Sequence, residues 1–262
     1  MKKVFHFDIN GTIIPNDTTE SGTDEENANM IIAKNVYGTV SVSNKWYLRT
    51  SNIYNSQAAI TYYDYLRQYY KDYKLRAFTF THPGNPGETL NKFVEPLMNA
   101  MTAFLFPSFL KVLEKYHDTT IVFRTFGLDA DEVIHYLRTN KKTTKMFGNV
   151  IKGKFTYPNG EIHLTLEDGT VLVNMDKVNE LIKSAPPEQH FAFIENYNHW
   201  NDHNRDKEHG KQLLGDKDIL QIFFDDNPCV NMSGENVHFV QVNTLNVLFD
   251  ENYYTSILDQ FV

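Results

Sequence analysis

The sequence has little cysteine, little positive charge and no long hydrophobic run. Cys229 is the one cysteine among 262 residues, which excludes an intramolecular disulfide and favours a reducing compartment. The net charge of −8 argues against a general binder of nucleic acids or anionic membranes. No run of about 18 apolar residues could span a membrane, and Asp8 interrupts the apolar run that a signal peptide would need. We therefore expect a cytoplasmic protein without nucleic-acid or membrane partners; the oligomeric state stays open.

What the chain does have is the composition of an ordinary globular protein. Hydrophobic residues make up 41 % and charged residues 22 %, and a chain of 262 residues can bury a sizeable core. With 19 phenylalanines and 15 tyrosines, we expect that core to be rich in aromatic side chains. The length fits one large domain, or a core domain with an insertion.

The first candidate site follows the apolar run of residues 4–7, which predicts a buried strand. Asp8 stands at the carboxyl end of this strand, and Asn10, Gly11 and Thr12 follow in a turn whose backbone N–H groups could hold a phosphate. Open parallel α/β sheets bind their ligands at the carboxyl ends of strands. Aspartate and asparagine also form turns that have no other role, so this stretch alone leaves both interpretations open.

Helix and strand patterns alternate along most of the chain. Helices are expected over residues 25–35, 57–73, 89–104, 106–116, 129–139, 175–184 and 253–261, and strands over 119–123, 190–194, 218–224 and 237–242. The pattern over residues 36–56 is ambiguous, with β-type patches at 37–42 and 45–50. This alternation predicts an α/β fold with a Rossmann-like parallel sheet and helices on its faces.

Tyrosines recur at three- and four-residue spacing through the helix expected over residues 57–73. Such a stripe could stack against the ring of a substrate, but it is more often the packed face of a helix, and we favour the packed face. The residues of the stripe are Tyr62, Tyr65, Leu66, Tyr69, Tyr70 and Tyr73.

Residues 150–175 break the alternation. Asn159-Gly160 and Asp168-Gly169 separate three short β-type runs, which is the signal for two tight hairpins. We expect a small β-hairpin insertion here, forming a flap at the edge of the sheet.

Two further strand ends carry side chains suited to binding ions. Thr125 lies just after the strand expected at 119–123, at its carboxyl end, and its hydroxyl could donate to a bound anion. Asp225 and Asp226 follow the strand expected at 218–224, where burying an unpaired carboxylate pair would cost several kcal/mol. Mg²⁺, a hard cation with oxygen ligands, would neutralise the pair, so we favour a functional interpretation of these two residues.

The most polar stretch of the chain, residues 195–211, offers a lysine and an alternative metal site. Lys207 or Lys211 could supply a fixed positive charge for a phosphoryl group, although a solvated surface lysine is equally common. Lys211 opens a helix-like run and is the better placed of the two. A metal site is a weaker alternative, because the spacing matches no known zinc pattern, and its ligands would be His199, Asp202, His203 and His209.

In chain order, these features resemble the four motifs of the haloacid dehalogenase (HAD) superfamily. The motifs are Asp8 with Asn10-Gly11-Thr12, then Thr125, then a downstream lysine, and last Asp225-Asp226. The first and fourth motifs are the specific part, and the resemblance covers the whole chain as a scaffold. It implies a Rossmann-like core, Mg²⁺ as cofactor and a phosphatase-type hydrolase that transfers the phosphoryl group of a small phosphorylated substrate through an aspartyl-phosphate.

The resemblance also implies a role for each motif residue. Asp8 would be the nucleophile, and Thr125 and Lys211 would hold the phosphoryl oxygens, with Gly11 and Thr12 in the substrate-binding loop. Lys211 would also restrain the charge of Asp8.

On the metal side, the resemblance implies that Mg²⁺ is held by Asp8, the backbone carbonyl of Asn10 and Asp226, with Asp225 beside them. It further implies an α/β core over residues 1–16 and 104–262, with the 150–175 flap inside it. A helical cap over residues 17–103 would select the substrate.

Asn10 departs from the pattern of the superfamily. Phosphatases of this kind usually carry a second Asp two residues after the nucleophile, as general acid and base, and an amide cannot transfer a proton. Three interpretations follow: a specialised phosphohydrolase that takes its acid from the cap or from His6, a pseudo-enzyme that keeps the phosphate and Mg²⁺ pocket for binding, or an unrelated α/β fold. The intact charged motifs favour the first interpretation, and Asn10 favours the second.

Overall fold

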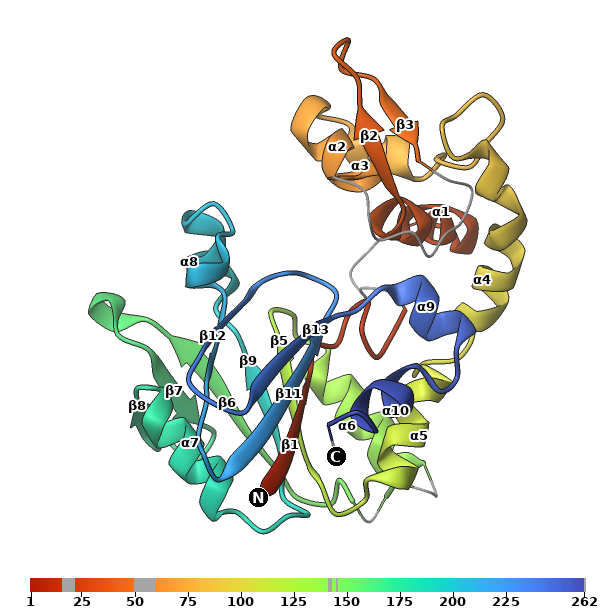
Figure 1. Ribbon diagram of the computed structural model, residues 1–262. Helices are drawn as coiled ribbons and strands as arrows, with labels where there is room; N and C mark the ends of the chain where they lie inside the picture. The colour runs from red at the N-terminus through yellow and green to blue at the C-terminus, as the bar shows by residue number, and fades with distance from the viewer. Residues whose placement is uncertain (16–21, 50–59, 141–142, 145, 262) are drawn as a thin grey trace. The chain divides into compact units, whose positions relative to one another are not determined.

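The computed structural model describes residues 1–15, 22–49, 60–140, 143–144 and 146–261, and it divides into two compact units (Figure 1). The first unit comprises Met1–Ile13 and Phe109–Val242, and the second comprises Ile14–Ser108 and Asn243–Val262. The sequence led us to place all of residues 104–262 in the core, and the carboxyl end departs from that expectation. Asn35 of the second unit accepts a hydrogen bond from the Thr244 N–H at 2.9 Å, which ties the chain end to that unit.

The first unit is built around an eight-stranded sheet in the order β13-β11-β1-β5-β9-β6-β7-β8. Neighbours from β13 to β6 all pair in parallel, whereas β7 and β8 pair antiparallel. The protein therefore has the mixed α/β fold with a mostly parallel sheet that the sequence predicted, compatible with a Rossmann-like core. The strands are β1 (Lys2–Phe7), β5 (Thr120–Thr125), β6 (Val150–Thr156), β7 (His163–Leu166), β8 (Val171–Val173), β9 (His190–Ile194), β11 (Ile219–Asp225) and β13 (Val237–Gln241).

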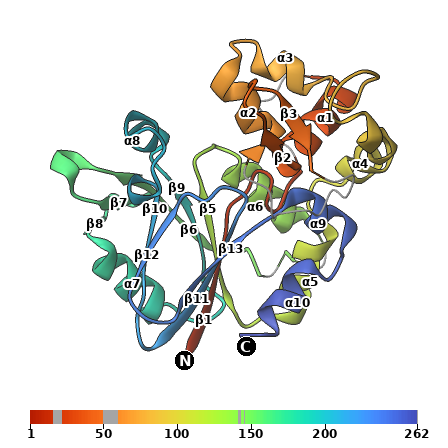
Figure 2. The ribbon, with the colours of Figure 1, turned by 45° about the horizontal axis from the view of Figure 1, so that its top comes forward.

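Alternation along β1 sends neighbouring side chains to opposite faces of the sheet. Val4 packs in one buried cluster with residues of α7 (Met175–Ser184). Phe5 and Phe7 point to the other face, where Phe7 meets Phe109 of α5 (Pro107–Lys115) with ring centroids 5.0 Å apart. Figure 2 shows α7 and α5 on opposite sides of the sheet. The continuous apolar run is thus explained by burial on both faces.

The sheet contains a topological switch point between β1 and β11. From β1 the chain continues to β5 on one side, whereas from β11 it continues to β13 on the other side. Open α/β sheets bind ligands in the crevice outside the carboxyl ends of such strands. Asp8 directly follows β1 and Asp225 is the last residue of β11, so both carboxylates lie at this crevice.

The region expected to form hairpins is a three-stranded antiparallel meander, β6-β7-β8. The short 3-10 helix η2 (Pro158–Gly160) connects β6 to β7, and Asn159 and Gly160 adopt left-handed backbone angles with φ of 54° and 82°. β6 also pairs in parallel with β9, so this meander continues the main sheet at its edge. The remaining elements of this unit are α6 (Ala130–Thr139), α8 (Tyr197–Asp202), η3 (Lys207–His209) and a parallel pair formed by β10 (Lys211–Leu214) and β12 (Val230–Ser233).

The second unit packs helices around a small antiparallel sheet with an aromatic core. Its elements are α1 (Asp24–Asn35), β2 (Tyr37–Val40), β3 (Trp46–Leu48), β4 (Ile60–Thr61), α2 (Tyr62–Tyr69), α3 (Tyr73–Ala77), η1 (Glu88–Phe93), α4 (Val94–Met101), α9 (Thr244–Phe249) and α10 (Tyr253–Leu258). Across the described segments of the chain, no helix is long and apolar enough to cross a membrane. The sequence did not predict α9, and it predicted a longer closing helix than α10.

The expected helix over residues 57–73 is wrong at both ends. Residues 57–59 lie outside the described residues, and Thr61 caps α2 by accepting from the Asp64 N–H at 3.0 Å. Tyr70 is extended, with φ −134° and ψ 135°, and separates α2 from α3. The threonine cap and the extended tyrosine outweigh the periodic tyrosine pattern, which does not by itself define helix ends.

Acid is expected to destabilise the first unit through His190. Burial lowers the pKa of His190 from 6.5 to about 4, and its Nδ1 accepts the Ile121 N–H at 3.1 Å. Below about pH 6.5 the unfolded chain binds a proton that the folded chain binds only below about pH 4, so stability falls as pH drops through this window. For this residue we expect a loss of about 2 kcal/mol between pH 7 and pH 5.

Urea unfolding of the wild type and His190→Asn at the two pH values would measure this loss. Asparagine can still accept the Ile121 N–H but does not titrate, so the variant should lose less stability than the wild type between pH 7 and pH 5. His6, whose pKa burial lowers to about 3, acts in the same direction in both proteins and cancels in the comparison. Equal losses in the two proteins would contradict the assignment to His190.

Candidate functional site

The centre of the site is the buried ammonium group of Lys211. Its Nζ donates to Asp8 Oδ1 at 2.5 Å, to Asp225 Oδ2 at 2.7 Å and to the Arg124 carbonyl oxygen at 2.8 Å. The side chain is 1 % exposed, so water does not screen these contacts. A lysine has three N–H donors, and all three are used here, which fixes the ammonium group between the two carboxylates.

The strand β10, and not a helix, positions Lys211. The helix-like interpretation of this run was wrong, because β10 pairs in parallel with β12 and the Lys211 N–H donates to the Cys229 carbonyl at 2.8 Å. A Cβ atom on Gly210 would lie 1.9 Å from that same carbonyl oxygen, so only glycine allows the chain to approach so closely. Lys207, the alternative lysine, opens η3 and is exposed.

Three carboxylates converge beside this lysine. Asp8, Asp225 and Asp226 can each offer an oxygen so that all three atoms lie within 4.8 Å of one another, and among the described residues theirs is the one group of this kind. Burial raises the pKa of Asp8 well above its ordinary value. The charge of Lys211 lowers this pKa, whereas the charges of Asp225 and Asp226 raise it. Burial also lowers the pKa of Lys211, but Asp225 and Asp8 outweigh that effect and leave it above its ordinary value.

The charge and chemistry of this group suit a divalent cation. With all three carboxylates ionised, these groups and the ammonium carry a net charge of −2 in a site where two of the carboxylates, Asp8 and Asp225, are buried. Hard cations such as Mg²⁺ prefer oxygen ligands and retain several waters, so three carboxylates on two neighbouring strand ends are a fitting donor set. The buried amide oxygen of Asn10, which has no hydrogen-bond partner, is a further oxygen near the site.

The side chains of Asn10 and Thr125 both approach Gly127. A Cβ atom on Gly127 would be 3.3 Å from Asn10 Nδ2 and 3.5 Å from Thr125 Oγ1. The Thr125 hydroxyl oxygen accepts from the Gly127 N–H at 3.0 Å, and its own proton can still be donated. The two strand ends β1 and β5 are therefore brought together as the sequence predicted.

Sequence reasoning missed Asp129 as a partner of Asn10. The Asn10 Nδ2 donates to Asp129 Oδ2 at 2.8 Å, and Asp129 is buried. Asp129 occupies the N-cap position of α6 but makes no capping hydrogen bond with its side chain. A cap residue whose carboxylate turns away from its helix was not detectable in the sequence.

The loop of Gly11 and Thr12 is part of the scaffold around these carboxylates. Gly11 has φ 74°, a left-handed conformation that glycine adopts without strain. Thr12 is fully buried, and its hydroxyl accepts from the Asp226 N–H at 3.2 Å. This hydrogen bond joins the segment after β1 to the segment after β11.

A buried ion pair beneath the site was also missed. Arg124 and Glu195, both almost fully buried, form an ion pair, and Arg124 Nη2 donates to the Gln212 carbonyl at 3.1 Å. The signal was a charged residue inside the apolar strand TIVFRT, together with a glutamate directly after HFAFI. Because the Arg124 carbonyl also accepts from Lys211, this pair fixes the backbone on which Lys211 rests.

The structure does not support His6 as a proton donor, nor His199, His203 and His209 as metal ligands. His6 is buried, its Nε2 lies 3.0 Å from Gln221 Oε1, and its low pKa makes it neutral near pH 7, so it is a poor acid. The rings of His203 and His209 stack with centroids 3.9 Å apart, and His199 lies beside them. Within the described part of the chain, the metal-capable group contains none of these histidines.

Comparisons with known proteins do not place the chain in a family. No family model, no curated protein and no solved structure matches it. Its function therefore has to be inferred from the site itself.

Proposed function

We propose that this protein is a Mg²⁺-dependent phosphohydrolase or phosphotransferase of the HAD type, which acts on a small phosphorylated molecule through an aspartyl-phosphate on Asp8. The observation that carries the proposal is the Lys211 ammonium held 2.5 Å from Asp8 and 2.7 Å from Asp225. Both carboxylates stand at the switch point of the sheet, where α/β proteins bind ligands. A purely structural site has no need of a third carboxylate there.

The proposed reaction uses Asp8 as the nucleophile. One Asp8 oxygen forms a bond to phosphorus while the bond from phosphorus to the leaving oxygen breaks, and that oxygen takes up a proton from solvent. Water later attacks the acyl phosphate, loses a proton to solvent, releases phosphate and restores the carboxylate. The charge of Lys211 favours the ionised form of Asp8, and the Lys211 N–H that meets Asp8 in the free protein would turn to a phosphoryl oxygen. The Thr125 hydroxyl would donate to another. Asp8, Asp226 and the Asn10 carbonyl would hold Mg²⁺, with Asp225 beside them; the ion would offset the repulsion between the carboxylate and the phosphate.

The finer domain expectations belong to the same proposal. Residues 17–103, which lie within the second unit, would act as a cap that selects the substrate, and the 150–175 meander would be the flap. An aromatic second unit suits a small organic phosphate better than a protein substrate, and this preference is an analogy with the superfamily.

A second candidate function is binding without turnover, and Asn10 favours it. Its amide donates to Asp129 and cannot transfer a proton to a leaving group. General acid–base assistance is worth about 10²–10⁴-fold in rate. A pocket that binds phosphate and Mg²⁺ but lacks this assistance could serve as a ligand sensor.

Release of phosphate from an aryl phosphate, with and without Mg²⁺, separates the two functions. We expect slow Mg²⁺-dependent turnover by the wild type and about 10²-fold faster turnover by Asn10→Asp. The new carboxylate would face Asp129, and two adjacent carboxylates that share a proton supply an acid at neutral pH.

The double variant Asn10→Asp/Asp8→Asn is the matched control and should be inactive. Activity in Asn10→Asp alone would make binding the function of the natural chain. Inactivity of every variant, with no rise of the melting temperature in Mg²⁺, would contradict both functions.

A further inference from the structure

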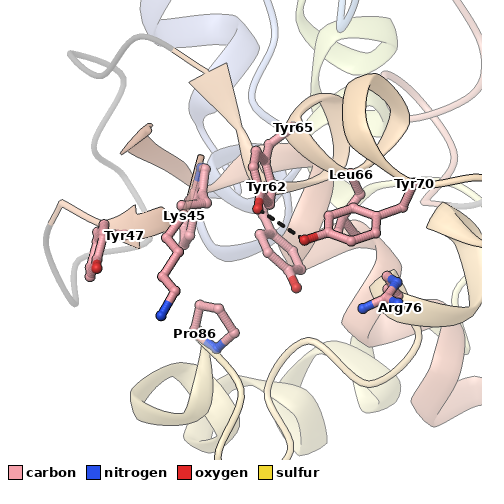
Figure 3. A pocket seen from close by; sticks show the side chains of 9 residues that line it. Lys45, Tyr47, Tyr62, Tyr65, Leu66, Tyr70, Arg76 and Pro86 are labelled. Carbon is pink, nitrogen blue, oxygen red and sulfur yellow. Dashed lines mark hydrogen bonds between the residues drawn. The ribbon is translucent and has the colours of Figure 1, made fainter. Parts of the chain in front are cut away.

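The second unit contains a cavity of about 200 Å³ that has no part in the proposed reaction (Figure 3). Its walls come from the segment around β3, from α2 and α3, and from the loop that precedes η1. The lining residues that matter for ligand binding are Lys45, Trp46, Tyr62, Tyr65, Tyr70 and Arg76.

The floor of this cavity is a fixed aromatic surface. Tyr62 stacks on Phe80 with ring centroids 4.3 Å apart, and Trp46 meets Tyr62 edge to face at 5.0 Å. The Tyr65 hydroxyl donates to the Asn44 carbonyl at 2.8 Å, which ties α2 to the β2–β3 turn. Trp46, Tyr62 and Tyr65 are all buried, so the surface exists before any ligand arrives. Preformed apolar and aromatic walls are typical of small-molecule sites.

The charges around this floor have one sign. Lys45 and Arg76 are cationic, and the lining contains no carboxylate, although the whole chain carries a net charge of −8. Figure 3 shows the Lys45 ammonium and the Arg76 guanidinium on opposite sides of the tyrosine rings. Among the described residues, no carboxylate pairs with Lys45. The cavity is therefore suited to an anion.

Arg76 is held ready for such an anion. Its guanidinium lies over the Tyr70 ring, 4.2 Å from the centroid, and its Nε donates to the Asp72 carboxylate at 2.9 Å. Both contacts leave the terminal N–H groups of the fork for a ligand, and a guanidinium binds a carboxylate through two parallel hydrogen bonds. The Tyr62 hydroxyl points into the same space and is a further donor (Figure 3).

We infer that this cavity binds a small aromatic carboxylate, whose ring lies against Tyr62 and Tyr70 and whose charge meets Arg76 and Lys45. The aromatic floor suits a ring, and a carboxylate suits the charge of Lys45 together with the terminal N–H groups that Arg76 keeps beside its pair with Asp72. This inference rests on residues of the second unit alone and does not depend on phosphoryl transfer.

Titrations followed by NMR of the two tryptophan side chains test it. The chain has two tryptophans, Trp46 in the cavity and Trp200 in the first unit, so a ¹⁵N-labelled protein gives one reporter and one internal control. Trp200→Phe assigns the two indole signals. Naphthalene-2-carboxylate should shift the Trp46 signal in a saturable way and leave the Trp200 signal in place, without Mg²⁺ or phosphate.

Two further comparisons, one of ligands and one of variants, test whether binding needs both the ring and the carboxylate. Naphthalene-2-methanol keeps the ring, and acetate keeps the charge. Each should bind at least about tenfold more weakly than naphthalene-2-carboxylate. Arg76→Gln should weaken naphthalene-2-carboxylate about tenfold. Arg67→Gln is the matched control, because Arg67 is also exposed and paired with an aspartate on α2 but does not line the cavity.

Equal binding of the neutral and charged rings, or an unchanged affinity in Arg76→Gln, would overturn the inference. So would the absence of any shift at Trp46. Because the assay contains no phosphate ester, its failure leaves the proposed function of Asp8 untouched, and inactivity of Asp8 leaves this inference untouched.

Discussion

Replacing Lys211 with methionine is expected to lower the free energy of unfolding by about 3–5 kcal/mol at neutral pH. Methionine keeps most of the volume of the side chain but removes the charge that lies between Asp8 and Asp225. Two buried carboxylates would then face each other without a counter-charge, in surroundings where water does not screen them. Urea unfolding of the two proteins in the presence of EDTA measures the effect without any contribution from a metal.

Lys207→Met is the matched control for this change, since Lys207 is the other lysine of the same segment and is exposed. It should change the free energy of unfolding by less than about 0.5 kcal/mol. A double-mutant cycle that combines Lys211→Met with Asp8→Asn isolates the direct pair. We expect the double variant to recover part of the loss, and strict additivity would mean that the two side chains do not interact.

Replacing Asp8 with asparagine is expected to reduce Mg²⁺-dependent phosphate release roughly 10³-fold or more, because an amide is a poor nucleophile and cannot form the acyl phosphate. The same change should leave the metal-free protein as stable as the wild type, or about 1 kcal/mol more stable. Burial raises the pKa of Asp8, which means that the fold disfavours its charged form. Lys211 would keep Asp225 as its partner in the variant.

Loss of activity together with unchanged or increased stability would mark Asp8 as a residue kept for function. Asp218→Asn is the control, because Asp218 immediately precedes β11, at its other end from Asp225, and is half exposed. That variant should keep full activity. Retained activity in Asp8→Asn would remove Asp8 as the nucleophile, whereas a large loss of stability would assign the carboxylate a structural role.

The sequence by itself determined the elements that carry the carboxylates. Short apolar runs bounded by polar residues indicated β1, β5 and β11. A polar side chain that could take part in chemistry stands at the carboxyl end of each run. Burial on both faces of a parallel sheet requires such runs, so the pattern is local and readable. From these runs followed the α/β class and the proximity of Asp8, Thr125 and Asp225.

Only the tertiary structure decided how these groups are partnered. It chose Lys211 over Lys207 by placing it on a strand, and it paired Asn10 with Asp129 and Arg124 with Glu195. Asn10 and Asp129 are 119 residues apart, and Lys211 and Asp8 are 203 residues apart. Such pairs depend on which strands become neighbours in the sheet, and on which strand ends lie at the same edge of it. The periodicity of apolar residues predicts which face of a segment is buried. It does not predict which distant segment will pack beside that face.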